Sequence, residues 1–247
     1  MPIIWVTGDT HGDWIHRVNM YSFPEQREMS KDDYVIILGD FGIWRDSPQQ
    51  RWYLNWLEEK HFTTLFIDGN HENYDILDSY PVEEWHGGKV HFIKPSIIHL
   101  MRGQVFDIDG LKFFTFGGAS SHDISDGVLE IDDPRVKEWR DDPDKMYRIN
   151  HISWWEREMP NQEEMDEGIK NLAEHDNKVD FILTHCTASS TAALLSHGLY
   201  KPDKLTNYFE EIRCNVDYKR WLCGHYHDNK AITIKDIVLY EQIVRIA

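Results

Sequence analysis

The sequence has few cysteines, no basic leader segment and no long apolar run. A membrane helix needs about 18 consecutive apolar residues, and no stretch of the 247 residues approaches that length. The three cysteines are odd in number and form no C-x-x-C pair, which favours reduced thiols over a disulfide framework. Met1-Pro2-Ile3 lacks the basic segment of a secretory signal, so we expect a cytoplasmic protein without membrane spans.

Basic residues are also scarce relative to acidic ones. The chain has 26 Lys and Arg against 43 Asp and Glu, a formal net charge of −17 at pH 7. General nucleic-acid binders gain affinity when Lys and Arg neutralise phosphates, so this balance argues against nucleic acid as a partner. We interpret most of the acidic residues as a solvated surface. The length is consistent with one domain, which we expect to span residues 1–247.

What the sequence does contain is a short apolar strand that leads directly into metal-ligand residues. Residues 3–7 are apolar and largely β-branched, and Gly8, Asp9 and His11 follow. This pattern predicts a buried strand, and open α/β sheets bind ligands at the carboxyl ends of their strands. With one residue between them, the carboxylate of Asp9 and the imidazole of His11 can bind the same metal ion. Taken alone, the motif is also compatible with an ordinary turn.

The same pattern recurs at four later strand ends. The residues that follow these strands are, in chain order, Gly39-Asp40, Gly69-Asn70-His71-Glu72, Thr184-His185 and Gly224-His225-Tyr226-His227. If the five strands are neighbours in one sheet, their ligand-type side chains meet at one edge. Together they supply eight such groups, which exceeds the four ligands of a closed tetrahedral ion. The set favours two ions bridged by a shared carboxylate.

In this order, the five motifs resemble the complete signature of the calcineurin-like metallophosphoesterases: Asp-x-His, Gly-Asp, Gly-Asn-His-Glu, a single His and Gly-His-x-His. The resemblance extends from residue 8 to residue 227. It implies an α/β fold in which a two-sheet β-sandwich is flanked by helices, with four α/β/β/α layers. It also implies His71 as the catalytic histidine. The implied ligand sets are Asp9, His11 and His227 for one ion, Asn70, His185 and His225 for the other, and Asp40 as the bridge.

The reaction implied by this resemblance is metal-dependent hydrolysis of a phosphomonoester or phosphodiester. Two divalent ions roughly 3.5 to 4 Å apart each bind a phosphoryl oxygen, and a bridging water becomes the hydroxide that attacks in line. His71 then stabilises the developing charge or protonates the leaving oxygen. Ligation by histidines and carboxylates suits Mn, Fe, Zn, Co or Ni better than Mg or Ca. The substrate is a phosphoester carried by a small molecule or a phosphoprotein.

One motif departs from the phosphoprotein phosphatases of this superfamily. They continue the second motif as Gly-Asp-x-x-Asp-Arg-Gly, whereas this chain reads Gly39-Asp40-Phe41-Gly42-Ile43-Trp44-Arg45. Neither the position of the Asp that orients the catalytic histidine nor that of the Arg that binds phosphate matches, since Ile43 and Trp44 occupy them. Arg45, one place late, is the remaining candidate for a phosphate contact. The departure weakens the link to Ser/Thr phosphatases and to bis-nucleotide hydrolases, and leaves the broader phosphatase and phosphodiesterase groups.

Between the third and fourth motifs, the pattern changes twice. Segments 90–93, 97–100, 105–108 and 111–116 alternate and predict a β-meander, in which His91 and His99 are sheet residues and not ligands. Residues 117–160 are less regular and contain turn residues together with tryptophans. Long ordered loops are often functional, so we interpret this segment as a substrate-facing cap. The alternative is an excursion that only packs on the sheet. The candidate substrate contacts are Arg45, His122 and Trp154.

Two other functions remain open at this level. A metal-dependent nuclease of the same superfamily would need a basic, aromatic-lined groove beside the ions, which the net charge of −17 disfavours. A non-catalytic binding scaffold would usually have lost ligands, whereas every expected ligand and His71 are present. The final residues alternate at 232–234 and 238–240, and we expect both segments to complete the second sheet.

Overall fold

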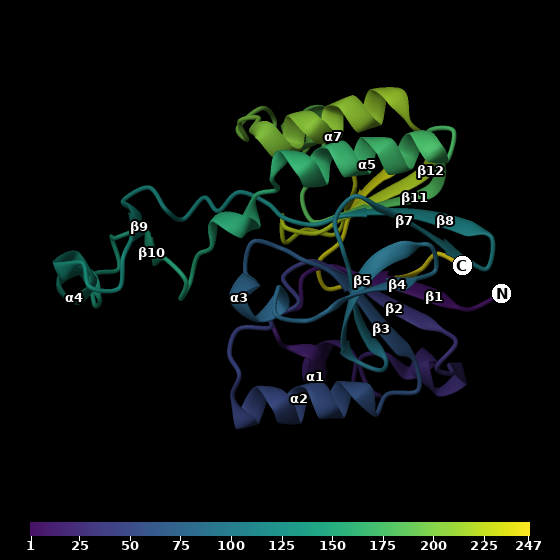
Figure 1. Cartoon of the computed structure of the whole chain (residues 1–247), viewed down its shortest axis with the longest axis horizontal. Coiled ribbons are helices and arrows are strands. Elements are labelled where there is room, and N and C mark those ends of the chain that lie inside the picture. The colour runs from purple at the N-terminus through teal and green to yellow at the C-terminus, as the bar shows by residue number, and fades with distance from the viewer.

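The computed structural model describes all 247 residues. Two main sheets pack face to face, and helices cover both outer faces, so the predicted four-layer sandwich is confirmed (Figure 1). Helix α2 (Pro48–Glu58) covers the first sheet, while α5 (Gln162–Glu174) and α7 (Lys204–Asn215) cover the second. No helix reaches the length and apolar content that crossing a membrane requires. The shorter helical segments are α1 (Trp14–Arg17), η1 (Pro24–Glu28), α3 (Tyr74–Leu77) and α6 (Ser189–Leu195).

The first sheet has seven strands in the order β15-β1-β2-β3-β6-β5-β4. Its centre is parallel and consists of β1 (Ile4–Thr7), β2 (Tyr34–Leu38), β3 (Thr63–Ile67) and β6 (Ile97–Leu100). The antiparallel strands are β5 (Gly88–Lys94), β4 (Val82–Trp85) and β15 (Ile243–Arg245). All residues of β2 and β3 are buried, because both faces of the parallel centre are covered.

The second sheet has six strands in the order β13-β14-β12-β11-β8-β7. The parallel strands are β8 (Leu111–Phe116), β11 (Lys178–Thr184), β12 (Asp217–Cys223) and β14 (Asp236–Val238). The edges, β7 (Gln104–Ile108) and β13 (Lys230–Ala231), are antiparallel. Residues on the inner faces of both sheets, such as Ile36 and Leu183, form the central core, while Val35 and Ile182 face the flanking helices. This alternation follows from the two-residue period of a strand.

The predicted meander exists, but it is divided between the two sheets. Strands β5 and β6 belong to the first sheet, and β7 and β8 belong to the second. The tight turn at Asp109 and Gly110 is present, with positive φ angles of 54° and 84°. His91 and His99 lie on β5 and β6 and are buried, as expected for sheet residues.

The prediction for the final strands was partly wrong. Residues 232–235 do not form a strand, because Thr233 and Asp236 close a turn in which the N–H of Ile232 donates to the carbonyl of Asp236. Strand β14 begins at Asp236 and joins the second sheet, whereas β15 crosses to the first sheet and pairs antiparallel with β1. The closing strands therefore belong to different sheets.

Residues 117–160 extend away from the sandwich, at the left of Figure 1. The segment is more regular than its sequence indicates: β9 (Gly127–Leu129) pairs in parallel with β10 (Tyr147–Ile149), and α4 (Pro134–Trp139) lies between them in sequence. The short helix η2 (Glu156–Glu158) returns the chain to the sandwich. Helix α4 forms the tip, far from the sheet edges (Figure 1).

Candidate metal centre and active site

All five motifs lie at one edge of the sandwich, where parallel strands of both sheets end. Loops after β1, β2 and β3 of the first sheet supply one half of the site, and loops after β11 and β12 of the second sheet supply the other. The sheets therefore bring together residues that are far apart in sequence. The first half consists of Asp9, His11, Asp40, Asn70 and His71, and the second of His185, His225 and His227.

Asp9, His11 and His227 form a close group of possible donor atoms. The Nε2 atoms of His11 and His227 are 3.0 Å apart, and Asp9 Oδ2 is 3.2 Å from His227 Nε2. Asp9 Oδ2 is buried and has no hydrogen-bond partner. A buried carboxylate oxygen without a partner is costly, and a cation among these three side chains would satisfy it. The residues therefore fit a metal ion, as the sequence predicts.

His185 is the centre of the second group. Its Nε2 is 3.1 Å from Asn70 Oδ1 and 3.4 Å from Asp40 Oδ1, and its ring centroid is 5.0 Å from that of His225. Its Nδ1 must donate to the carbonyl of Leu38, 2.7 Å away, because a carbonyl only accepts. The lone pair of the neutral imidazole is then on Nε2, which faces the other candidate ligands.

Asp40 lies between the two groups and contacts both. Its Oδ1 is the oxygen near His185, whereas its Oδ2 is 3.8 Å from His11 Nδ1. The two oxygens of one carboxylate thus face different histidine sets. Asp40 is therefore placed between the two groups of possible metal ligands.

The backbone of the candidate ligands is unusual. His11, Asp40, His225 and His227 have positive φ angles of 47°, 45°, 67° and 49°. Left-handed backbone costs a residue with a Cβ roughly 1–2 kcal/mol, and such strain concentrates at functional sites. The four residues therefore hold conformations that the surrounding fold stabilises at this edge.

Two glycines allow the sheets to approach each other closely here. A Cβ on Gly39 would overlap the ring of His185, and a Cβ on Gly224 would overlap the carboxylate of Asp9. Each glycine belongs to one sheet and the side chain that it admits belongs to the other. Glycine at these positions therefore brings the ligands of the two sheets within reach of one another.

The carboxylates of Glu72 and Asp9 also hold the loops of the site in place through hydrogen bonds to backbone N–H groups. The buried carboxylate of Glu72 accepts hydrogen bonds from the backbone N–H groups of Phe41, Gly42 and Ile43, which immediately follow Asp40. Asp9 Oδ1 accepts from the N–H of His225 at 2.8 Å. This role of Glu72 was not predicted from the sequence, although the place of Glu72 in Gly-Asn-His-Glu was a signal for it.

Asn70 is oriented by buried hydrogen bonds that involve one residue from the beginning and one from the end of segment 117–160. Its Nδ2 lies 3.3 Å from Ser121 Oγ, and the N–H and hydroxyl of Ser121 donate to the carboxylate of Glu158 at 2.8 and 2.7 Å. Because the amide nitrogen donates to Ser121, the amide oxygen points toward His185. Burial raises the pKa of Glu158 to about 7. Ser121 and Glu158 were not identified from the sequence.

The electrostatic field at this edge favours positive charge. Burial opposes protonation of His185, yet the carboxylates of Asp40 and Asp9 raise its pKa to about 10. His71 differs, because burial lowers its pKa despite the nearby carboxylate of Asp40. The site thus attracts cations, whereas His71 is a neutral imidazole at neutral pH.

His71 lies where two cavities meet. One cavity, of about 520 Å³, is also lined by Trp44, Arg45 and Arg148. The other, of about 570 Å³, is also lined by His122. The indole N–H of Trp44 donates to the carbonyl of His71 at 2.9 Å and so anchors the loop. Arg45 and His122, both predicted substrate contacts, therefore lie beside His71.

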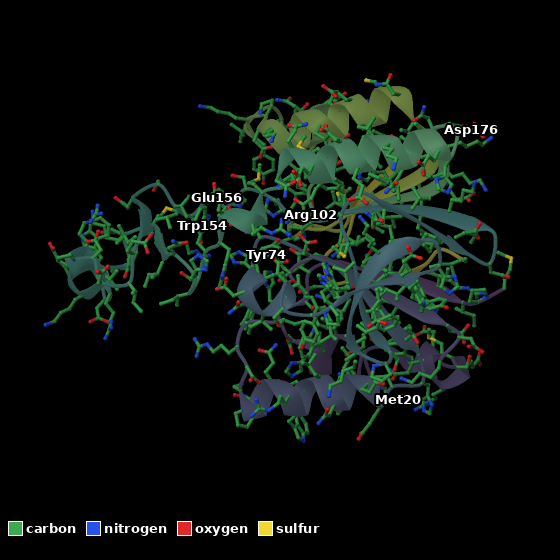
Figure 2. The ribbon with its side chains drawn as sticks, in the orientation of Figure 1. Met20, Tyr74, Arg102, Trp154, Glu156 and Asp176 are labelled. Atoms are coloured by element: carbon green, nitrogen blue, oxygen red, sulfur yellow. The ribbon has the colours of Figure 1, made fainter.

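The structure does not bring Trp154 to this site. Trp154 lines a separate cavity of about 510 Å³ with Asp75 and His151. Figure 2 shows Trp154 at the base of the protruding segment, on the side of Tyr74. From β10, Arg148 lines the cavity with His71 and is ion-paired with Asp123. Only the base of segment 117–160 therefore reaches the candidate active site.

Comparison with known proteins identifies the family. A sequence model described as calcineurin-like phosphoesterase matches residues 3–229. The chain belongs to the calcineurin-like phosphoesterase family. This phosphoesterase is 27% identical over 128 residues to the lariat debranching enzyme of Schizosaccharomyces pombe. The match covers 45% of this chain and 26% of that enzyme, so this chain spans about a quarter of the length of the lariat debranching enzyme. The crystal structure of phosphopantetheinyl hydrolase from Mycobacterium tuberculosis aligns with 97% of this chain and 90% of that chain, at 17% identity and a TM-score of 0.43.

Proposed function

We propose that this phosphoesterase hydrolyses a phosphomonoester or phosphodiester with the help of two bound divalent metal ions. The observation that carries the proposal is Asp40, whose two carboxylate oxygens face two separate histidine sets beside His71. When bound, the ions neutralise phosphoryl oxygens and lower the pKa of a bound water. The proposed ligands are Asp9, His11 and His227 for one ion, Asn70, His185 and His225 for the other, and Asp40 for both.

His71 is the proposed catalytic residue. Its ring lies 5.6 Å from the ring of His11, centroid to centroid, so it is beside the proposed ions without being in either donor group. Because burial lowers its pKa, the neutral ring carries one N–H at neutral pH. That N–H can donate a hydrogen bond to a phosphoryl or leaving-group oxygen and stabilise the negative charge that develops there as the ester bond breaks.

The charge and the chemical type of the proposed ligands indicate the classes of substrate and of metal ion. Asn70 is a neutral ligand, so the site keeps more of the positive charge that attracts phosphate. The donor set of histidines and carboxylates favours Mn, Fe, Zn, Co or Ni. We propose a phosphoester of a small molecule or a phosphoprotein, processed in the cytoplasm by one domain that spans residues 1–247 and carries the protruding segment at 117–160.

The experiment that tests this function combines metal analysis with two chromogenic substrates. We expect the purified protein to contain two transition-metal ions per chain and to cleave p-nitrophenyl phosphate or bis-p-nitrophenyl phosphate only with metal present. The preferred substrate separates a monoesterase from a diesterase. Full activity after exhaustive chelation would refute the proposal.

A further inference from the structure

The space between the two sheets opens to solvent at the side opposite β4 and β7. The second sheet ends there with β14 and β13, the first ends with β15, and a cavity of about 870 Å³ lies between them. None of the proposed metal ligands lines this cavity. It is therefore separate from the candidate active site.

The floor of this cavity is apolar. Phe181, Leu222 and Leu239 belong to the central core between the sheets, whereas Ile237, Val244 and Ile246 pack against that core and are only partly buried. No further strand covers these inner-face residues beyond the short edges β13 and β15. The cavity thus borders the inter-sheet core, and its partly exposed apolar surface comes from Ile237, Val244 and Ile246.

The rim of the cavity is basic, which is the opposite of the chain as a whole. Five exposed cationic side chains line it against one carboxylate, although the whole chain has 26 basic and 43 acidic residues. The single carboxylate, Asp217, already lies 3.8 Å from Lys178. The basic residues are Lys219, Arg220, Lys230, Lys235 and Arg245.

Four of these cations have no ion pair with a side chain. Lys219 is paired with Asp180 at 2.6 Å. Arg220 donates to the backbone carbonyl of Lys219, Arg245 donates to the carboxyl oxygen of the last residue, Ala247, and the ammonium group of Lys235 lies 4.9 Å from the ring centre of Tyr218. Positive charge on this rim is therefore available to an anion.

We propose that this cavity binds a single-chain amphiphile with an anionic head group, such as a long-chain carboxylate or an alkyl phosphate. The apolar floor takes the alkyl chain, and the cations of the rim take the head group. A volume of about 870 Å³ is typical of small-molecule sites. A protein strand is disfavoured as the occupant, because β13 has two residues and β15 has three, which leaves little edge for strand addition.

The cavity also borders the segment that packs on the metal edge. Asn229, one of its lining residues, accepts hydrogen bonds from the backbone N–H groups of Tyr240 and Gln242 at 2.9 and 3.1 Å. The ring of Tyr240 stacks on His227, with 4.4 Å between centroids. The cavity is therefore connected to a proposed metal ligand, His227, through Asn229 and Tyr240.

Titration calorimetry on the full chain tests the proposal directly. Dodecanoate, used below its micelle concentration, should bind with one site per chain. Dodecyltrimethylammonium has the same alkyl chain with the opposite charge, and acetate has the same charge without the chain; neither should show saturable binding. If both amphiphiles bind with similar Kd, or if dodecanoate does not bind, the proposal is wrong.

Variants locate the site. Arg220→Glu and Lys235→Glu change exposed side chains, and each should raise the Kd for dodecanoate about tenfold, equivalent to about 1.4 kcal/mol. Lys137→Glu, at an exposed position on α4, makes the same charge change away from the cavity and should leave the Kd unaltered. Val244→Trp should abolish binding by filling the floor. Equal Kd values for Lys235→Glu and Lys137→Glu would overturn the assignment, whatever the folding of Val244→Trp.

Discussion

Asp40 and His71 are neighbours with different proposed roles. The backbone N–H of His71 donates to the side-chain Oδ1 of Asp40 at 2.8 Å, and this hydrogen bond joins the two loops. The carboxylate of Asp40 faces two donor groups, whereas the ring of His71 faces the cavities. Substitutions at the two positions should therefore have different consequences for metal content.

We expect His71→Ala to retain both metal ions and to lose about 10²–10⁴-fold in kcat, the range of general acid and base catalysis. Asp40→Ala should lose metal together with activity, because both ions share its carboxylate. Metal content and rate should be measured on the same preparations. A His71→Ala protein with half the metal content would show that His71 is a ligand.

Glu158 gives a prediction about pH. Its pKa is raised by burial from 4.5 to about 7, so the folded state binds its proton more tightly than the unfolded state does. The contribution of Glu158 to the free energy of unfolding is therefore most favourable below pH 4.5. It declines as the pH rises to about 7, by at most about 3 kcal/mol. Glu158→Gln cannot titrate and should lack this decline.

The measurement is urea unfolding of both proteins between pH 4.5 and 8, without metal, so that metal binding adds no pH dependence of its own. The free energy of unfolding of the wild type should fall relative to that of Glu158→Gln as the pH rises. Parallel curves for the two proteins would show that Glu158 does not titrate in this range.

At the scale of elements, segment 117–160 divides into a base and a tip. The base includes Arg148, which lines the cavity with His71, and the tip includes α4 with Arg135, which pairs with Asp133. Both arginines are in ion pairs, but only one reaches the candidate active site. Comparing them separates a role in substrate binding from a general effect of charge.

We expect Arg148→Ala to raise the KM for the better chromogenic substrate about tenfold, as for loss of a charged hydrogen bond. Arg135→Ala should leave KM and kcat unchanged. Steady-state kinetics with equal metal loading checks both. Similar KM values for the two variants would show that the base of the segment has a structural role and does not bind substrate.

The sequence predicted some elements well and others poorly, for a physical reason. The strands before each motif are short apolar runs that end in glycine and polar residues, so local pattern sufficed for β1, β2, β3, β11 and β12. The division of the meander and the crossing of β15 to the first sheet depend on pairings between distant residues. Trp154 lines a different cavity from that of His71, although its neighbours Ser153 and Trp155 line the cavity of His71, and no local pattern encodes which of these side chains faces it.

At the scale of the molecule, the proposed ligands of each ion come from both sheets. Metal binding should therefore stabilise the packing of one sheet on the other, since the ions bind the folded state. At a metal concentration of 100 times Kd, one site adds about 2.7 kcal/mol to the free energy of unfolding. This corresponds to an increase of roughly 5–10 °C in Tm for a chain of this size. Thermal unfolding with Mn²⁺ and with a chelator measures the shift. Asp40→Ala should lose it, and an equal shift in that variant would contradict the proposed sites.

The joining of the two sheets at one edge also bears on protein synthesis. His11 and His227 are 216 positions apart in the sequence, yet their ring nitrogens are 3.0 Å apart in the fold. On the proposed assignment, a nascent chain has its first-sheet ligands early, but the set for one ion is complete only at residue 225 and the set for the other only at residue 227. On that assignment, we expect unfinished translation products to be inert, so that hydrolytic activity would report that nearly the whole chain has been made and folded.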